Sequence, residues 1–178
     1  DLNKEEIDHL ILITSLVELV KHYCSAKKIG TYLTDEEVDY YYDWNGLMYF
    51  LYEYERERCH KETKKRPAYE WEDIKKMGRE ESIEHILPKQ IYTETADLTN
   101  LTYWTTRFDE KSHGKNECRL GNLTLTTSNS KLGRKPFDLK KQIYANSKFQ
   151  IERDMTNFQD WTEKEIGERE RLLVEFAK

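Results

Sequence analysis

Residues 82–90 of the chain, SIEHILPKQ, place a carboxylate and an imidazole side by side inside an otherwise apolar segment. An imidazole is the natural general base near neutral pH, and carboxylate oxygen is a ligand that hard cations such as Mg²⁺ prefer. Hydrolysis of a phosphodiester needs a base that deprotonates water and a cation that neutralises charge in the transition state. Glu84 and His85 are therefore candidates for half of such a site.

A cation site needs ligands that converge, and one regular strand cannot supply them all. Consecutive strand residues point to opposite faces, so a bulge or a second element has to bring another oxygen ligand beside Glu84. Asn129 is expected at the start of a helix after a second strand, and it could be that ligand. The alternative stays open at this point, because a Glu–His pair in a short strand can also lie exposed at a sheet edge.

The segments around this pair predict a small two-stranded element. Residues 82–88 form a short apolar run that ends at Pro88, which is typical of a strand. Residues 118–129, CRLGNLTLTTSN, combine leucines with β-favouring threonines and predict the second strand, with a turn or bulge at Gly121. The run DEKSHGKNE at 109–117 predicts a loop.

Helices are expected on both sides of this element. Apolar residues at helical spacing predict one helix over residues 4–30. The aromatic-rich run 38–60 follows a capping-box pattern at Thr34 and Glu37, and its aromatic stripe is expected in the core rather than on a base-stacking surface. Further helices are expected over residues 70–77, 97–108, 137–144 and 163–178, the last opened by a capping box at Thr162 and Glu165.

Composition indicates a folded chain of 178 residues. Aromatic residues make up 12% of it, enough to build a core although 35% of the residues are charged. No run approaches the roughly 18 apolar residues that a membrane span needs, and no signal peptide is visible. Three widely spaced cysteines do not describe a disulfide framework, so a cytoplasmic location is expected. Because the first residue is Asp, the chain is expected to be a piece of a longer protein.

Positive charge is concentrated in one part of the chain. The formal net charge is -5, yet residues 111–148 hold nine basic residues and two acidic ones. This asymmetry predicts a face that binds a polyanion, and a solvated helix face is the plainer alternative. The candidate phosphate contacts are Lys131, Arg134, Lys135 and Lys140.

A rival interpretation builds a zinc site from Cys59, His60, His113 and Cys118. Cysteine and histidine are the usual ligands of structural zinc. Adjacent Cys59 and His60 depart from the spacing that paired zinc ligands usually have. With such a site, the chain would be a zinc-stabilised helical interaction domain.

Four segments in order carry a resemblance to a known family. They are EHILP, LGNLTLTTSN, PFDLKKQIY and DWTEKEIGERERLL, and they lie between Ser82 and Leu173. No single segment is specific, but the ordered set resembles the C-terminal nuclease domain of the GmrSD-type modification-dependent restriction endonucleases. That domain is a branch of the HNH, or ββα-metal, nucleases.

The resemblance implies a role for each polar residue of the motifs. His85 takes the position of the general base, and Glu84 before it that of a metal ligand. Asn122 matches the structural asparagine that ties down the loop holding the base, and Asn129 completes the site for Mg²⁺ or Mn²⁺. Many HNH nucleases have Asp where this chain has Glu84, which leaves open whether the longer side chain meets the metal directly or through water.

The motifs and the resemblance together predict an α+β, mainly helical protein with a ββα-metal core wrapped by helices from both ends. The expected parts are a helical subdomain (1–78), a nuclease core (79–148) and a helical closure (149–178), packed as one unit. The resemblance implies a metal-dependent DNA endonuclease or nickase in bacterial defence against phage. Its expected partner is an N-terminal nucleotide-hydrolysing domain, of the same or another chain, that senses DNA modification. The alternative is a module that keeps the fold and binds DNA or a partner without cleaving.

Overall fold

The computed structural model describes residues 15, 18, 31–33, 41–92 and 98–178. The chain divides into two compact units, residues 39–173 and residues 1–38 together with 174–178. Apart from Ser15 and Glu18, which are helical, the helix predicted over residues 4–30 lies outside the described residues, as does the capping box predicted at Thr34 and Glu37. All the candidate site residues lie in the larger unit.

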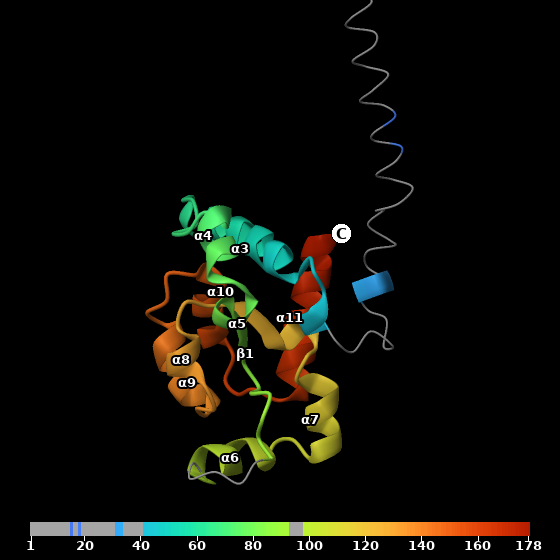
Figure 1. The fold of residues 1–178 in the computed structure, drawn as a ribbon, viewed down its shortest axis with the longest axis vertical. Coiled ribbons are helices and arrows are strands. Elements are labelled where there is room, and N and C mark those ends of the chain that lie inside the picture. The colour runs from blue at the N-terminus through green and yellow to red at the C-terminus, as the bar shows by residue number, and fades with distance from the viewer. Residues whose placement is uncertain (1–14, 16–17, 19–30, 34–40, 93–97) are drawn as a thin grey trace, which may run out of the picture. The chain divides into compact units, whose positions relative to one another are not determined.

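Short helices dominate the larger unit, and a two-stranded sheet lies among them (Figure 1). Its first half contains η1 (Tyr41–Asp43), α3 (Leu47–Thr63), α4 (Trp71–Met77), α5 (Arg79–Ser82), β1 (Ile83–His85), α6 (Leu98–Thr105) and α7 (Glu110–Asn116). Its second half contains η2 (Leu120–Asn122), β2 (Leu123–Leu125), α8 (Asn129–Leu132), α9 (Phe137–Tyr144), α10 (Gln150–Arg153), η3 (Asp154–Asn157) and the start of α11 (Glu163–Ala177). The described residues are thus mainly helical with a small sheet, as the sequence predicted.

The sheet pairs β1 with β2 in antiparallel orientation. The register places Ile83 opposite Leu125, Glu84 opposite Thr124 and His85 opposite Leu123. Both strands are shorter than predicted, and η2 takes up the residues directly before β2. A Cβ on Gly121 in that turn would lie 2.1 Å from the backbone oxygen of Ile166, so α11 packs against bare backbone there.

The prediction of a loop over residues 109–117 is wrong, because α7 occupies most of it. Asp109 caps this helix by accepting a hydrogen bond from the backbone N–H of Ser112 at 2.7 Å. His113 and Asn116 are buried, so one face of this helix packs against the rest of the unit although its sequence is polar. His113 also places Nε2 2.8 Å from Pro88 O, which links α7 to the segment after β1.

The hydrophobic core forms around the chain as it leaves β1. Ile86 and Leu87 are fully buried there, together with Trp104 of α6, Phe137 of α9 and Trp161. These residues belong to three of the four motif segments and to a helix between them. The motif segments therefore also contribute to the core. Within the described ranges, none of the helices combines the length and apolar character that a membrane span requires.

Candidate functional site

The edge of β1 that faces away from β2 is covered by polar side chains from two helices. In an antiparallel pair, only every second residue of a strand hydrogen-bonds to the partner strand. Glu84 bonds to β2, so the backbone carbonyls of Ile83 and His85 point to the opposite edge of β1. Asn129, the first residue of α8, donates from Nδ2 to Ile83 O at 3.1 Å and to Glu80 O at 2.7 Å. Lys140 of α9 donates to His85 O at 3.2 Å. The two side chains satisfy an edge that would otherwise be open to pairing.

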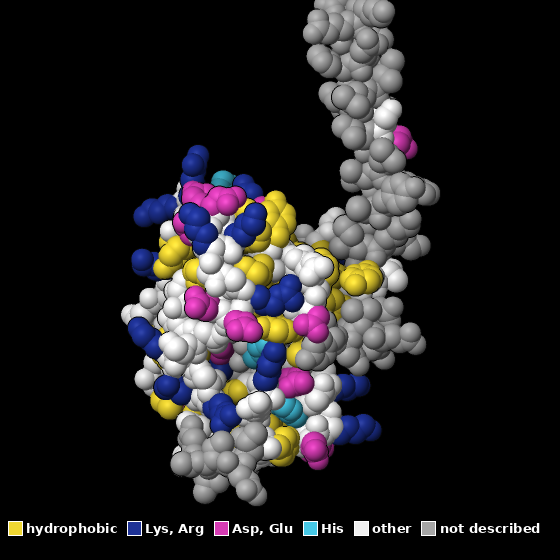
Figure 2. Space-filling model, in the orientation of Figure 1, with side chains coloured by type: hydrophobic (Ala, Val, Ile, Leu, Met, Phe, Trp, Pro, Cys, Tyr) yellow, Lys and Arg dark blue, Asp and Glu magenta, His cyan; other side chains and the backbone are white. Residues whose placement is uncertain are grey.

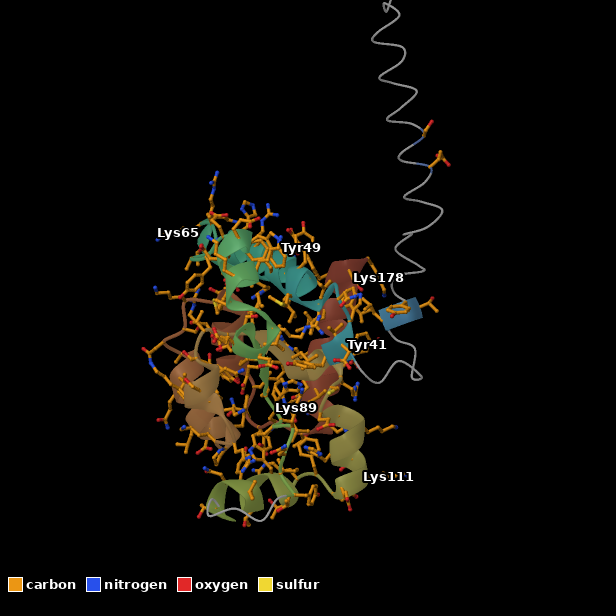
Figure 3. The ribbon with its side chains drawn as sticks, in the orientation of Figure 1. Tyr41, Tyr49, Lys65, Lys89, Lys111 and Lys178 are labelled. Carbon is orange, nitrogen blue, oxygen red and sulfur yellow. The ribbon has the colours of Figure 1, made fainter. Side chains whose placement is uncertain are left out.

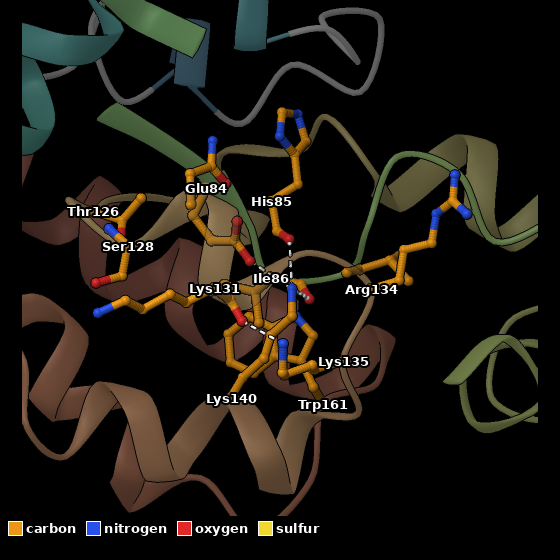
Figure 4. Close-up of polar contacts among 12 residues, drawn as sticks. Glu84, His85, Ile86, Thr126, Ser128, Lys131, Arg134, Lys135, Lys140 and Trp161 are labelled. Carbon is orange, nitrogen blue, oxygen red and sulfur yellow. Dashed lines mark hydrogen bonds and ion pairs between the residues drawn. The ribbon is translucent and has the colours of Figure 1, made fainter. Parts of the chain in front are cut away.

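Glu84 and Lys140 form a buried ion pair. The glutamate is 2% exposed and the lysine 0%, and Nζ lies 2.5 Å from Oε1. The ammonium also donates to the backbone oxygens of His85 and Ile86, at 3.2 and 3.0 Å, so its three N–H donors are all used (Figure 4). Burial raises the pKa of the Glu84 carboxyl and lowers that of the Lys140 amine, and the contact between their charges opposes both shifts.

His85 points to the opposite side of β1 from this ion pair (Figure 4). Its ring centroid lies 4.7 Å from that of Tyr42, and its Nε2 lies 4.0 Å from Cys118 Sγ. Lys89, labelled in Figure 3, holds its ammonium 3.5 Å from the centroid of the same tyrosine ring. Burial, followed by the charges of Lys89 and Lys140, lowers the pKa of His85 to about 3. The imidazole is therefore neutral at physiological pH, the form that can accept a proton.

Asn122 joins the turn before β2 to the segment after β1. Its Oδ1 accepts from Leu87 N at 2.7 Å and from Trp161 Nε1 at 3.0 Å. Its Nδ2 donates to Leu87 O at 2.9 Å and to Glu117 O at 2.8 Å. These four bonds use the full capacity of a buried amide. Because Leu87 lies two residues after His85, the amide holds the backbone directly after the strand that carries the imidazole.

Glu84 and Asn129 are the residues beside the sheet that could hold a divalent cation. Lys140 binds Oε1 of Glu84, and the Asn129 amide uses Nδ2 for backbone carbonyls, so Oε2 of Glu84 and Oδ1 of Asn129 lie outside these bonds. Mg²⁺ commonly takes one or two carboxylates and completes its shell with water and phosphate. Among the described residues, no three His, Cys, Asp or Glu side chains gather into a metal site. These side chains therefore form no closed structural metal site in the described part of the chain.

The structure separates the four predicted phosphate contacts. Lys131 is exposed, while Arg134 and Lys135 are partly exposed. Lys135 Nζ donates to Lys131 O at 2.6 Å, and Arg134 Nη2 donates to Gln90 Oε1 at 2.9 Å. The prediction for Lys140 is wrong, because its side chain is fully buried in the ion pair. On the face drawn in Figure 2, Lys and Arg side chains are scattered among acidic ones rather than gathered in one block.

The zinc interpretation is wrong. Cys59 is buried and donates from Sγ to Glu55 Oε1 at 3.0 Å, while His113 faces Pro88 O. The four proposed ligands all belong to the described part of the chain, in which no cluster of three metal-binding side chains forms.

Lys140 and Trp161 are the site residues whose roles the sequence analysis missed. Phe137, Lys140 and Tyr144 recur at helical spacing on α9, and all three are fully buried. A lysine on the apolar face of a short helix is a signal that it has a buried acidic partner. No sequence pattern indicates the hydrogen bond from the Trp161 indole to Asn122, because the two residues are 39 positions apart.

These features define a class of domain: a helical unit that holds a Glu–His pair on a short two-stranded antiparallel sheet and ties the sheet to the following segment with a buried asparagine. Residues 30–176 match the family model described as GmrSD restriction endonucleases, C-terminal domain. The match covers most of the chain, so the chain belongs to this restriction endonuclease-related family. No curated protein and no solved structure matches it.

Proposed function

We propose that this domain hydrolyses phosphodiester bonds of DNA with His85 as the general base. The observation that carries the proposal is an imidazole whose backbone is held by two buried side chains. Lys140 binds the carbonyl of His85 itself, and Asn122 binds both backbone groups of Leu87. Membership in a restriction endonuclease family supports DNA as the substrate.

The surroundings of His85 favour a base that becomes stronger when a phosphate arrives. Its side chain is 9% exposed, and Lys89 lies on the same side of β1. Burial, and then the charges of Lys89 and Lys140, lower the pKa of the imidazole. A phosphate beside Lys89 would offset the part of this shift that the charge of Lys89 causes. The imidazole could then take a proton from a water molecule.

The family resemblance implies Mg²⁺ or Mn²⁺, and Glu84 and Asn129 would hold it. When bound, the cation would neutralise charge that develops on the phosphate in the transition state. Lys131, Arg134 and Lys135 would position the DNA backbone through phosphate contacts, which carry no sequence information.

The biological setting is part of the same proposal. The domain would act in the cytoplasm in bacterial restriction of phage DNA, together with an N-terminal nucleotide-hydrolysing domain that senses DNA modification. The family description supports the restriction role. The sensor domain would deliver the modified DNA, because cations and acidic side chains are interspersed on the face drawn in Figure 2.

A second candidate is a module that keeps this fold and binds DNA or a partner without cleaving. The Glu84–Lys140 pair favours it, because the lysine already neutralises the carboxylate that a metal would use. The near-complete burial of His85 points the same way.

Nicking of supercoiled plasmid separates the two candidates. The nuclease proposal predicts conversion to the open-circular or linear form with Mg²⁺ or Mn²⁺, and none when EDTA is added. A protein that binds the plasmid in a gel-shift assay but leaves it supercoiled with either metal would support the non-cleaving module instead.

A further inference from the structure

Lys89 is an exposed lysine on the His85 side of β1. Its Nζ lies 3.5 Å from the centroid of the Tyr42 ring, and the centroid of the His85 ring lies 4.7 Å from the same point. The ammonium and the imidazole are therefore no further apart than these two distances together. One phosphate group and one water molecule, joined by ordinary hydrogen bonds, can bridge such a gap.

The Tyr42 ring that both groups contact is held in place by Arg79. Nη1 of Arg79 donates to Tyr42 O, and Nη2 donates to Trp44 O at 3.1 Å. These two bonds fix the backbone that carries the ring. Because both terminal nitrogens of Arg79 bind carbonyl oxygens, this arginine supports the ring, and Lys89 is the exposed cation that the ring holds beside His85.

The Lys89 ammonium has no ion pair and no hydrogen bond to another described residue. The face of the tyrosine attracts its charge but supplies no oxygen, so N–H donors of the ammonium remain for a ligand. By contrast, Lys131 and Lys135 lie across β1 from the His85 ring (Figure 4), and Lys135 Nζ donates to Lys131 O at 2.6 Å. A phosphate that approaches the imidazole would therefore meet Lys89 rather than these two lysines.

We propose that Lys89 binds a phosphate of the DNA backbone beside His85 and that Tyr42 positions the ammonium for this contact. The inference rests on the proposed nuclease function, because it assigns a substrate contact to the same site. An ammonium binds phosphate as a point charge with three donors, so the contact adds affinity but no sequence preference. The same charge would stabilise the negative charge that develops on the bound phosphate in the transition state.

DNA binding in the presence of EDTA, which prevents metal-dependent cleavage, tests the contact. The variants are Lys89→Met, which keeps the length of the side chain, Lys89→Arg, which keeps the charge, and Lys65→Met as the control. Lys65 is exposed on the loop after α3 and lies apart from Lys89 (Figure 3). In fluorescence anisotropy titrations of a labelled duplex, Lys89→Met should bind about tenfold more weakly, with a salt slope smaller by about 1.

Lys89→Arg and Lys65→Met should bind the duplex like the parent, because the first keeps the charge and the second removes a charge away from the site. Equal affinity of Lys89→Met and the parent would overturn the proposal. Equal losses with Lys89→Met and Lys65→Met would also overturn it, because the loss would then reflect the total charge of the protein.

The role of Tyr42 is tested through its coupling to Lys89. Tyr42→Leu removes the ring face and should weaken DNA binding by about threefold, whereas Tyr42→Phe keeps the face and should bind like the parent. Adding Tyr42→Leu to Lys89→Met should cause no further loss. A loss of equal size in both backgrounds would contradict the positioning role.

Plasmid nicking with Mn²⁺ separates this inference from the proposed function. Lys89→Met should nick at least about tenfold more slowly than the parent. If the parent nicks and Lys89→Met matches it in both nicking and binding, Lys89 does not contact the substrate, and the nuclease proposal stands. If the parent does not nick but Lys89→Met still loses binding, the nuclease proposal fails and the phosphate contact is supported.

Discussion

Single residues of the site are held by groups that are far from them in the sequence. Glu84 on β1 meets Lys140 on α9, 56 positions later. His85, one residue further on, faces Tyr42, Cys118 and Lys89. Consecutive side chains of a strand point to opposite faces, so the two neighbours have different surroundings. Glu84 contacts the Lys140 ammonium, and His85 contacts an aromatic ring and a thiol.

The ion pair makes the first prediction. Lys140→Met leaves a buried carboxylate without its partner and should lower the free energy of unfolding by about 3 to 5 kcal/mol. The double variant Glu84→Gln, Lys140→Met removes both charges and should recover most of that loss. Urea denaturation measures both effects. A Lys140→Met protein as stable as the parent would show that the pair contributes nothing to folding.

Glu152 makes the second prediction, on pH. Burial raises its carboxyl pKa to about 7, the negative charges of Glu84 and Glu55 add to the shift, and hydrogen bonds from Ser147 and Thr126 oppose it. Between its ordinary value of 4.5 and about 7, the folded protein binds a proton that the unfolded chain does not. Stability should therefore fall as pH rises through this window, by up to about 3 kcal/mol.

Glu152→Gln is the matched variant, because it keeps the shape and removes the titration. Its stability should change less than that of the parent between about pH 5 and about pH 8 in urea denaturation. Identical pH slopes for the two proteins would mean that Glu152 does not titrate in this range.

At the scale of elements, α11 packs closely against η2 because Gly121 has no side chain there. A Cβ at Gly121 would lie 2.1 Å from Ile166 O and 3.0 Å from the Cβ of Glu170. Gly121→Ala must move α11 or the turn, and we expect a loss of about 2 kcal/mol or more. Gly114→Ala is the control, because nothing lies within 4 Å of its added Cβ and alanine favours helix. Thermal melts in which both variants match the parent would contradict this close packing.

The sequence predicts elements well where one periodicity or one motif decides them. The helices α4, α6, α9 and α11 fall within their predicted ranges, and both strands lie inside theirs. The loop prediction over residues 109–117 failed because a capped, polar helix shows little apolar periodicity. Local patterns cannot show contacts such as that between Lys140 and Glu84, because these depend on how α9 packs against the edge of β1.

At the scale of the whole unit, two buried cations cover the two outer edges of one short sheet. Lys140 binds His85 O beside β1, and Arg169 binds Leu123 O beside β2. Two paired strands of three residues are not stable alone, so the surrounding helices must hold them. The residues of the site therefore depend on helices from both the middle and the end of the chain.

DNA binding makes a prediction at the same scale. The formal net charge is -5 and acidic side chains lie among the exposed cations, so binding should be weak, independent of sequence and steeply weakened by salt. Replacing Lys131 and Lys135 together with Glu should lower the affinity and flatten the salt dependence in gel-shift titrations, without unfolding the domain. If the affinity is unchanged, Lys131 and Lys135 do not contact DNA, and the basic segment 111–148 is only a solvent-exposed surface.

The measurement that tests the central claim most directly compares plasmid nicking by His85→Ala and His60→Ala. His60 is exposed on α3 and does not belong to the sheet, so its replacement is the control for removing a histidine elsewhere in the protein. With saturating Mn²⁺, His60→Ala should nick like the parent, while His85→Ala should lose nicking by at least about a hundredfold and retain DNA binding and its melting temperature. If His85→Ala nicks plasmid as fast as the parent, His85 is not the general base and the proposed mechanism is wrong.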